Sequence, residues 1–393
     1  MKKRPFVYVI FSLIIALGAC NDPVFYMISV EPPLVEPLIG GSPTNFTVFN
    51  KEVYVASGRR IFSYDGKNWK SLSSQPGGRI MRLAATDSYL YALCFTDSGG
   101  NTILRRFSAA GKWEDLTGVT DGYNRLQSVY AANDKVFIGA ERNGLFIILY
   151  MADDDTGYSP LTPGGTDEEP VGMLCGIAYD DSIYYLCTGP SFRRTNPEIP
   201  VSSTVYVAQQ ITDPETTTAR KIEDVTFTGI INLGNNNILA ISRSGDLYNV
   251  NADADITVVK DISLEGRPST GALAVWVDKD DDSRRLLLAG RQDRLDYAVD
   301  SGYTYGYMEL ELDPGGINGI KAGKDFNVPG TFPSSSVADY ERYVSTIRKY
   351  PVNHIFQTPK SIDPEMTLFA STQKNGVWSY RQRGSEKIWN AEE

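Results

Sequence analysis

A short sequence pattern recurs along most of this chain and limits which folds the chain can adopt. The pattern is a β-rich run, a turn of glycine and polar residues, and a second β-rich run. Asn-Gly and Ser-Gly in such turns favour tight hairpins, because glycine accepts a positive φ without steric cost. The clearest copies are Val53–Tyr64, Val136–Ile147, Ile238–Tyr248 and Leu368–Tyr380, and weaker copies begin near Leu90, Ile183 and Leu286.

Each hairpin belongs to a larger unit of about four strands. A short apolar run and a polar turn precede the hairpin, as Leu126–Tyr130 does in one unit and Val352–Gln357 in the last. Several units end in a fourth run that holds an aromatic residue, at Trp69, Trp113, Tyr158 or Trp389. Four-stranded units of roughly 40–50 residues are the signature of a β-propeller.

The sequence therefore predicts an all-β fold, a seven-bladed β-propeller of four-stranded blades over residues 45–393. The hairpins start 37 to 55 residues apart, but 82 residues separate the last two, which predicts an insertion at about 313–350. Capping-box spacing at Ser336–Asp339 makes a short helix over Tyr340–Arg348 one interpretation of that insertion. A β-solenoid and two stacked sandwiches are the competing folds. The first and last units both look complete, so the mode of ring closure stays open.

The N-terminus has the pattern of an export signal. Lys2, Lys3 and Arg4 precede the apolar run Phe6–Ala19, which as a helix would be about 21 Å long. A bilayer core of about 30 Å needs roughly 20 residues. The pattern therefore predicts a secretory signal over residues 1–19, and not a membrane-spanning helix.

The apolar run ends in Leu17-Gly18-Ala19-Cys20, which resembles the lipobox of bacterial lipoproteins. That resemblance implies that Cys20 becomes the first residue and carries the lipid chains, which would hold the protein on a membrane of the bacterial cell envelope. The alternative is an ordinary signal peptide with a chance cysteine. Which membrane, and which of its faces, stays open.

Residues 20–44 are expected to be a tether between the lipid and the propeller. Prolines and glycines are frequent here, in Glu31–Pro37 and again in Gly40–Pro43. Proline fixes φ and removes a backbone donor, which favours an extended chain. The alternative is that Val24–Val30 forms a strand on the folded body.

The charge of the chain argues against one class of partner. Basic residues number 38 and acidic residues 48, so the formal net charge is −10, and no long basic run follows the first residues. Binding of nucleic acid needs clustered Lys and Arg against the phosphates. Nucleic acid is therefore not an expected partner.

The segment Ser63–Trp69 resembles the Asp-box of sialidase-type repeats, and the repeats as a whole also resemble those of the kelch type. The Asp-box resemblance implies a turn between third and fourth strands, in which Asp65 accepts backbone hydrogen bonds and Trp69 packs between blades. A sialidase also needs an arginine cluster and a tyrosine nucleophile. The family's arginine-bearing motif does not occur in this sequence, so the resemblance implies a fold and not an activity.

Two acidic runs and three cysteines are the other candidates for chemistry. Asp278–Asp282 and Asp153–Asp155 begin like calcium loops but lack the rest of the pattern, so neither a metal nor another cofactor is expected. Buried, reduced thiols are the main prediction for the cysteines, although Cys175 and Cys187 flank one hairpin and could form a disulfide. The cysteines are Cys94, Cys175 and Cys187.

The candidate ligand surface consists of three tyrosines and the single histidine. Tyr303, Tyr305 and Tyr307 alternate in one run, and tyrosines of this kind either anchor a protein or glycan ligand or pack against the next blade. His354 lies in the predicted innermost strand of the last unit and is expected to be structural. The sequence contains no nucleophile-elbow or zinc-protease motif.

Three functional hypotheses follow. The main one is a non-catalytic cell-envelope lipoprotein whose propeller is a binding or scaffold module for protein or glycan. The second is a carbohydrate-active or lactonase-like hydrolase that uses the propeller channel, because the chain has an Asp-box-like turn and many carboxylates in loops. The third is a scaffold subunit that docks through residues 313–350.

Overall fold

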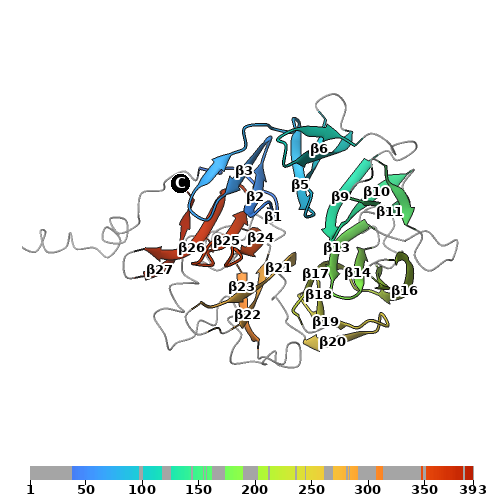
Figure 1. The fold of residues 1–393 in the computed structure, drawn as a ribbon. Helices are drawn as coiled ribbons and strands as arrows, with labels where there is room; N and C mark the ends of the chain where they lie inside the picture. Colours follow the sequence, from blue (N-terminus) through green and yellow to red (C-terminus); the bar gives the residue numbers. More distant parts are fainter. Residues whose placement is uncertain are drawn as a thin grey trace, which may run out of the picture.

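The described part of the chain folds into antiparallel sheets arranged around a ring (Figure 1). The structure is a computed structural model, and the 27 strands found in its described residues are numbered in chain order. The residues that it describes are 38–96, 101–116, 125–142, 145–153, 155, 157–161, 173–188, 202–210, 213–234, 237–243, 245–260, 269–279, 282, 284–290, 307–312, 347, 351–383 and 386–392.

Six sheets have four strands each in chain order, and the sixth sheet along the chain has three in the described residues. The first sheet contains β1 (Thr47–Phe49), β2 (Glu52–Ser57), β3 (Arg60–Tyr64) and β4 (Trp69–Ser71). The second contains β5 (Arg79–Ala85), β6 (Tyr89–Phe95), β7 (Thr102–Ser108) and β8 (Trp113–Asp115). The third contains β9 (Arg125–Ala132), β10 (Lys135–Arg142), β11 (Leu145–Ala152) and β12 (Ser159–Leu161).

The remaining four sheets continue around the ring. The fourth contains β13 (Met173–Tyr179), β14 (Ile183–Thr188), β15 (Ser202–Gln210) and β16 (Asp213–Glu223). The fifth contains β17 (Phe227–Asn232), β18 (Ile238–Ser242), β19 (Leu247–Val250) and β20 (Ile256–Lys260). The sixth contains β21 (Ser269–Val277), β22 (Arg284–Gly290) and β23 (Tyr307–Leu312). The last contains β24 (Val352–Gln357), β25 (Leu368–Thr372), β26 (Val377–Arg383) and β27 (Glu386–Ala391).

The prediction of an all-β propeller with four-stranded blades is confirmed. The second strand of every sheet begins within two residues of its predicted start. The first strands contact one another in chain order, from β1 through to β24, and lie toward the centre of the ring (Figure 1). A complete seventh blade stays a prediction, because the sixth sheet has three strands among the described residues.

The core is divided among the interfaces between neighbouring sheets. Each cluster of buried apolar side chains draws its members from two adjacent sheets, and together the clusters follow the whole ring. One sheet alone would leave two apolar faces in water, so burial of apolar surface holds the sheets in a ring.

The inner strands approach one another closely at two glycines. A Cβ atom on Gly229 of β17 would lie 2.0 Å from the carbonyl oxygen of Gly271 in β21. Gly271 also has a φ of +80°, which L side chains rarely adopt. A β-bulge or similar irregularity interrupts the pairing of first and second strands in every sheet after the first. Such irregularities bend a strand, which suits the crowded centre of a ring.

An N-terminal segment, residues 38–43, closes the ring between the first and last sheets. Val377 N–H donates to the Ile39 carbonyl at 3.1 Å, and Gly376 N–H donates to the Gly41 carbonyl at 2.9 Å. On the other side, Thr44 N–H donates to the Ala56 carbonyl of β2 at 2.7 Å. We call residues 38–43 the closing segment. It lies within the span expected to be a tether, so that part of the span belongs to the folded body.

The apolar layer beneath the closing segment joins the two ends of the chain. Ile39 has no exposed surface, and it shares a cluster with Phe46 and Trp69 from the first part of the chain and Phe369 and Val377 from the last sheet. Ring closure therefore needs no strand exchanged between the first and last sheets, whose four strands are each consecutive.

Several predictions made from the sequence lie outside the described residues. They concern the signal over 1–19, lipidation of Cys20, the tether up to residue 37, Tyr303, Tyr305, and the insertion at 313–350 apart from Ile347. Across the described ranges, the structure has no helix that is long and apolar enough to cross a membrane.

Candidate functional site

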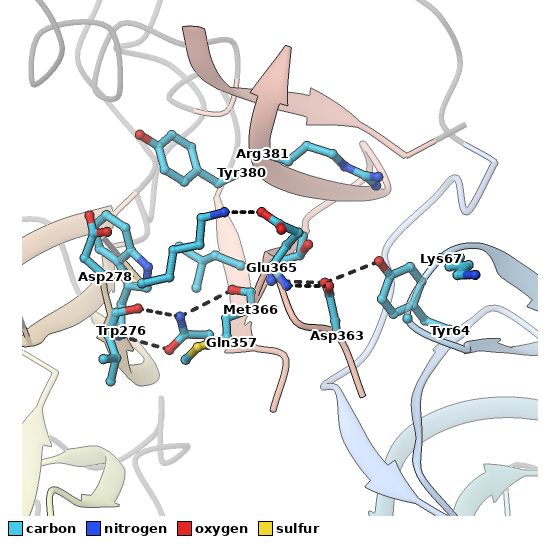
Figure 2. Close-up of a pocket in the computed structure, with 15 residues that line it drawn as sticks. Tyr64, Lys67, Trp276, Asp278, Gln357, Asp363, Glu365, Met366, Tyr380 and Arg381 are labelled. Carbon is cyan, nitrogen blue, oxygen red and sulfur yellow. Dashed lines mark hydrogen bonds and ion pairs between the residues drawn. The ribbon is translucent and has the colours of Figure 1, made fainter. Parts of the chain in front are cut away.

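A pocket of about 480 Å³ lies where the sixth, last and first sheets meet (Figure 2). We call it the junction pocket. Its walls come from the turn after β3, the end of β21 and the turn that follows, the loop between β24 and β25, and the middle of β26. Three sheets must be in place for this pocket to exist, so it depends on the closed ring.

The turn after β3 is the Asp-box-like segment. Asp65 Oδ1 accepts hydrogen bonds from the backbone N–H groups of Lys67 at 3.0 Å and Asn68 at 2.9 Å. The Lys70 ammonium and these amides lower the pKa of Asp65 to about 2. Gly66 has a φ of +92°, and a Cβ there would lie 2.2 Å from the Ile362 carbonyl oxygen. The turn therefore has the implied structural role, and its glycine allows contact with the last sheet.

Asp363 organises the loop between β24 and β25. Its carboxylate accepts hydrogen bonds from Glu365 N–H at 2.9 Å, Thr367 N–H at 3.2 Å and the Tyr64 hydroxyl at 3.4 Å. The Asp363 side chain is buried. Burial, followed by the charge of Asp363, raises the pKa of Tyr64 to about 12, so that hydroxyl stays protonated and donates. One carboxylate thus fixes both its own loop and the first sheet.

Two contacts hold the sixth and last sheets together across the pocket. The Gln357 side-chain oxygen accepts from Val277 N–H at 2.9 Å, and the Gln357 amide nitrogen donates to the Val277 carbonyl at 2.8 Å. Lys279 forms an ion pair with Glu365 of the loop. In Figure 2 these two contacts span the gap between the ribbons of the two sheets.

The two ends of the pocket differ in chemistry. At the sixth sheet, Trp276 is buried and meets Tyr380 edge to face, with ring centroids 5.8 Å apart. At the first sheet, Lys67 and Arg381 lie near Tyr64 (Figure 2). An aromatic pair therefore lines the pocket toward the sixth sheet, and two cationic side chains lie toward the first sheet.

His354 lies in β24, the innermost strand of its sheet, as predicted, but outside the junction pocket. Its Nδ1 atom accepts a hydrogen bond from Phe46 N–H at 3.3 Å, and the two rings lie 5.8 Å apart. Burial, with a smaller effect from the Arg82 charge, lowers the pKa of His354 to about 3. A neutral imidazole in this place is a structural acceptor that helps to hold the start of the first sheet.

The pH dependence of His354 can be measured directly, because no other histidine exists in the chain. We expect its ring NMR signals to titrate near pH 3 instead of the usual 6.5. The unfolded imidazole binds its proton first, so folding stability should fall as the pH drops below about 6.5, by at most about 1.4 kcal/mol per pH unit. His354→Gln keeps an acceptor and should remove this part of the pH dependence. A midpoint near 6.5 in the folded protein would contradict the assignment.

Tyr307 and the three cysteines are further residues that were named from the sequence and that the structure describes. Tyr307 is the first residue of β23. Cys94, Cys175 and Cys187 are unbridged, as favoured from the sequence, and burial raises the pKa of Cys94 to about 12 and of Cys175 to about 11.

One of the acidic runs has a structural role. Asp153 accepts hydrogen bonds from the hydroxyls of Thr86 at 2.5 Å and Tyr91 at 2.6 Å. Asp153 follows β11 in the third sheet, and Tyr91 lies in β6 of the second, so this carboxylate links two neighbouring sheets. Within the described ranges, no group of three His, Cys, Asp or Glu side chains is placed to hold a metal ion.

No protein-family model and no curated protein matches this chain. Solved structures do match. A structure of YCF48 bound to D1 peptide is 9% identical, with a TM-score of 0.51, over 89% of this chain and 94% of that one. The extracellular domain of BT4673 from B. thetaiotaomicron is 12% identical, with a TM-score of 0.54, over 90% of this chain and 40% of that one. A puromycin-hydrolysing peptidase of Mycobacterium tuberculosis is 12% identical, with a TM-score of 0.52, over 91% and 56%. At these identities the likeness shows the propeller fold alone.

Two segments that line the junction pocket were singled out from the sequence, Ser63–Trp69 and Asp278–Asp282, but the residues of the last sheet that complete it were not. Asp363 lies in a polar stretch that predicts only a turn, yet its spacing from Glu365 and Thr367 is that of a side chain that caps its own loop. Gln357 carried no local signal, because its partner Val277 lies in the neighbouring sheet, 80 residues away.

Proposed function

We propose that this protein is a non-catalytic binding or scaffold module of the bacterial cell envelope, anchored through a lipid on Cys20, and that it binds a segment of a partner protein in the junction pocket. The observation that carries the proposal is that the reactive groups of this pocket are used for internal bonds, while several charged side chains stay exposed at its mouth.

The polar groups of the pocket support binding over hydrolysis. A hydrolase needs a carboxyl group or hydroxyl that can exchange protons with the substrate. Here the Asp363 carboxylate accepts two backbone amides and the Tyr64 hydroxyl, and Glu365 is paired with Lys279. Both carboxylates are therefore engaged by other groups of the protein.

The same surfaces favour a protein segment over a glycan. Sugars stack on exposed aromatic faces, but Trp276 is only 6% exposed and is covered by Tyr380. Lys67, Lys279 and Glu365 are exposed and suit the charged side chains of a polypeptide. The YCF48 propeller was solved with a peptide bound, which supports peptide binding by a fold of this kind.

The test is site-specific photo-crosslinking in intact cells. A photoreactive amino acid at position 67 or 279 should give the same discrete adduct to a partner protein, because both positions line one pocket. The matched control is position 112, where an exposed lysine follows glycine in the corresponding turn of the second sheet. Absence of an adduct at 67 and 279, or the same adduct at 112, would contradict the proposal.

The lipid anchor has its own test. Cys20→Ala should release the protein from the membrane fraction.

A further inference from the structure

Three carboxylates in and beside the junction pocket already have partners within the protein. Asp65 is bonded to Lys70, and Glu365 is bonded to Lys279 at the other side of the pocket. Asp363 accepts three hydrogen bonds and points into its own loop. The carboxylates near this end therefore already have donors.

Arg381 is held in place by the side chains of Ser379 and Glu392. Its Nε atom donates to the Ser379 hydroxyl at 2.7 Å, and its Nη2 atom pairs with the Glu392 carboxylate. Glu392 is almost fully buried, whereas the Arg381 side chain is 40% exposed. The Nη1 atom has no partner within the described ranges. Arg381 and Tyr64 both line the junction pocket.

Lys67 is the second cation at this end. Its backbone N–H is fixed by Asp65, and its side chain is exposed. In the part of the chain that the structure describes, the Lys67 ammonium forms no hydrogen bond or ion pair. Figure 2 shows Lys67 and Arg381 on the same side of the pocket, beside Tyr64.

We infer that the partner segment bound in the junction pocket carries a carboxylate, which Lys67 and Arg381 bind together. This inference rests on the proposed function and names the chemistry of its ligand. A planar guanidinium held on two of its nitrogens presents the third in a fixed direction, and a neighbouring ammonium supplies a second donor, so a carboxylate satisfies both. Glu392 is a positioning residue for this site, because it orients Arg381 and does not face the ligand.

The experiment measures binding of a fluorescent hexaglutamate peptide, blocked at both ends, by anisotropy at low salt. The protein has a net charge of −10, so general electrostatic attraction would repel this probe and binding reports a local site. We expect hexaglutamate to bind more tightly than a matched hexaglutamine peptide, and we expect added salt to weaken the binding of hexaglutamate. Lys67→Gln and Arg381→Gln should each weaken binding by about three- to tenfold.

Lys112→Gln is the matched control and should change the affinity by less than about twofold, since Lys112 occupies the corresponding turn of the second sheet. All variants must retain the unfolding transition of the parent protein. The inference would be overturned if hexaglutamine bound as tightly as hexaglutamate. It would also be overturned if Lys112→Gln lost as much affinity for hexaglutamate as Lys67→Gln and Arg381→Gln. If positions 67 and 279 crosslink to a partner but the protein shows no preference for hexaglutamate, the proposed function is supported and only the carboxylate inference is contradicted. If the crosslinks are absent, the proposed function itself is contradicted.

Discussion

Asp363→Ala should lower the free energy of unfolding by about 3 kcal/mol or more, because it removes a buried carboxylate that joins two sheets. The substitution leaves the backbone amides of Glu365 and Thr367 without their acceptor, and it removes the carboxylate to which the buried Tyr64 hydroxyl donates. The loop that forms one wall of the junction pocket should then lose its shape. Denaturant unfolding followed by tryptophan fluorescence measures the change.

Glu365→Ala is the matched control, two residues away in the same loop. Its side chain is 71% exposed and forms an ion pair with Lys279. Exposed ion pairs contribute about 0–1 kcal/mol, so this variant should unfold almost like the parent. If both variants lost the same stability, the cost would come from the loop sequence in general and not from the carboxylate of Asp363.

Ile39→Ala should destabilise the protein by about 2–4 kcal/mol, the usual cost of truncating a fully buried isoleucine. Ile39 has no exposed surface and lies in the apolar cluster that joins the first and last sheets. A cavity there weakens the one interface that chain connectivity does not support. Thermal and denaturant unfolding both measure the effect, and a chain lacking residues 1–43 should lose more than the point variant.

The control for this interface is the preceding residue. Leu38 is 51% exposed, so Leu38→Ala should change the free energy of unfolding by less than about 0.5 kcal/mol. A chain that lacks only residues 1–37 should unfold like the full-length protein. Stability unchanged by loss of the whole closing segment would show that the apolar cluster alone closes the ring.

The repeats were predictable because each depends on residues close together in the chain. The hairpin from Val53 to Tyr64 has its glycine turn and both strands within twelve residues, and the structure places β2 and β3 there. The polar turn before each hairpin and the aromatic residue in the fourth strand are equally local. A strand period and a turn signal are therefore enough to predict the blades.

The junction pocket was not predictable, because its contacts join residues far apart in sequence. Tyr64 and Asp363 are 299 residues apart, and Val277 and Gln357 are 80 residues apart. Nothing near Tyr64 in the sequence indicates a carboxylate partner in the last unit. His354 was correctly placed in an inner strand, but its hydrogen-bond partner, Phe46, is 308 residues away.

The closing segment brings the two ends of the described chain together, since Leu38 N–H donates to the Glu392 carbonyl at 2.5 Å. Ends this close make the fold suitable for circular permutation. A short linker from residue 392 to residue 38 would preserve every sheet and every interface, and new termini could be opened in any exposed turn. The place at which the chain enters and leaves the ring could then be moved from one sheet to another without altering the junction pocket.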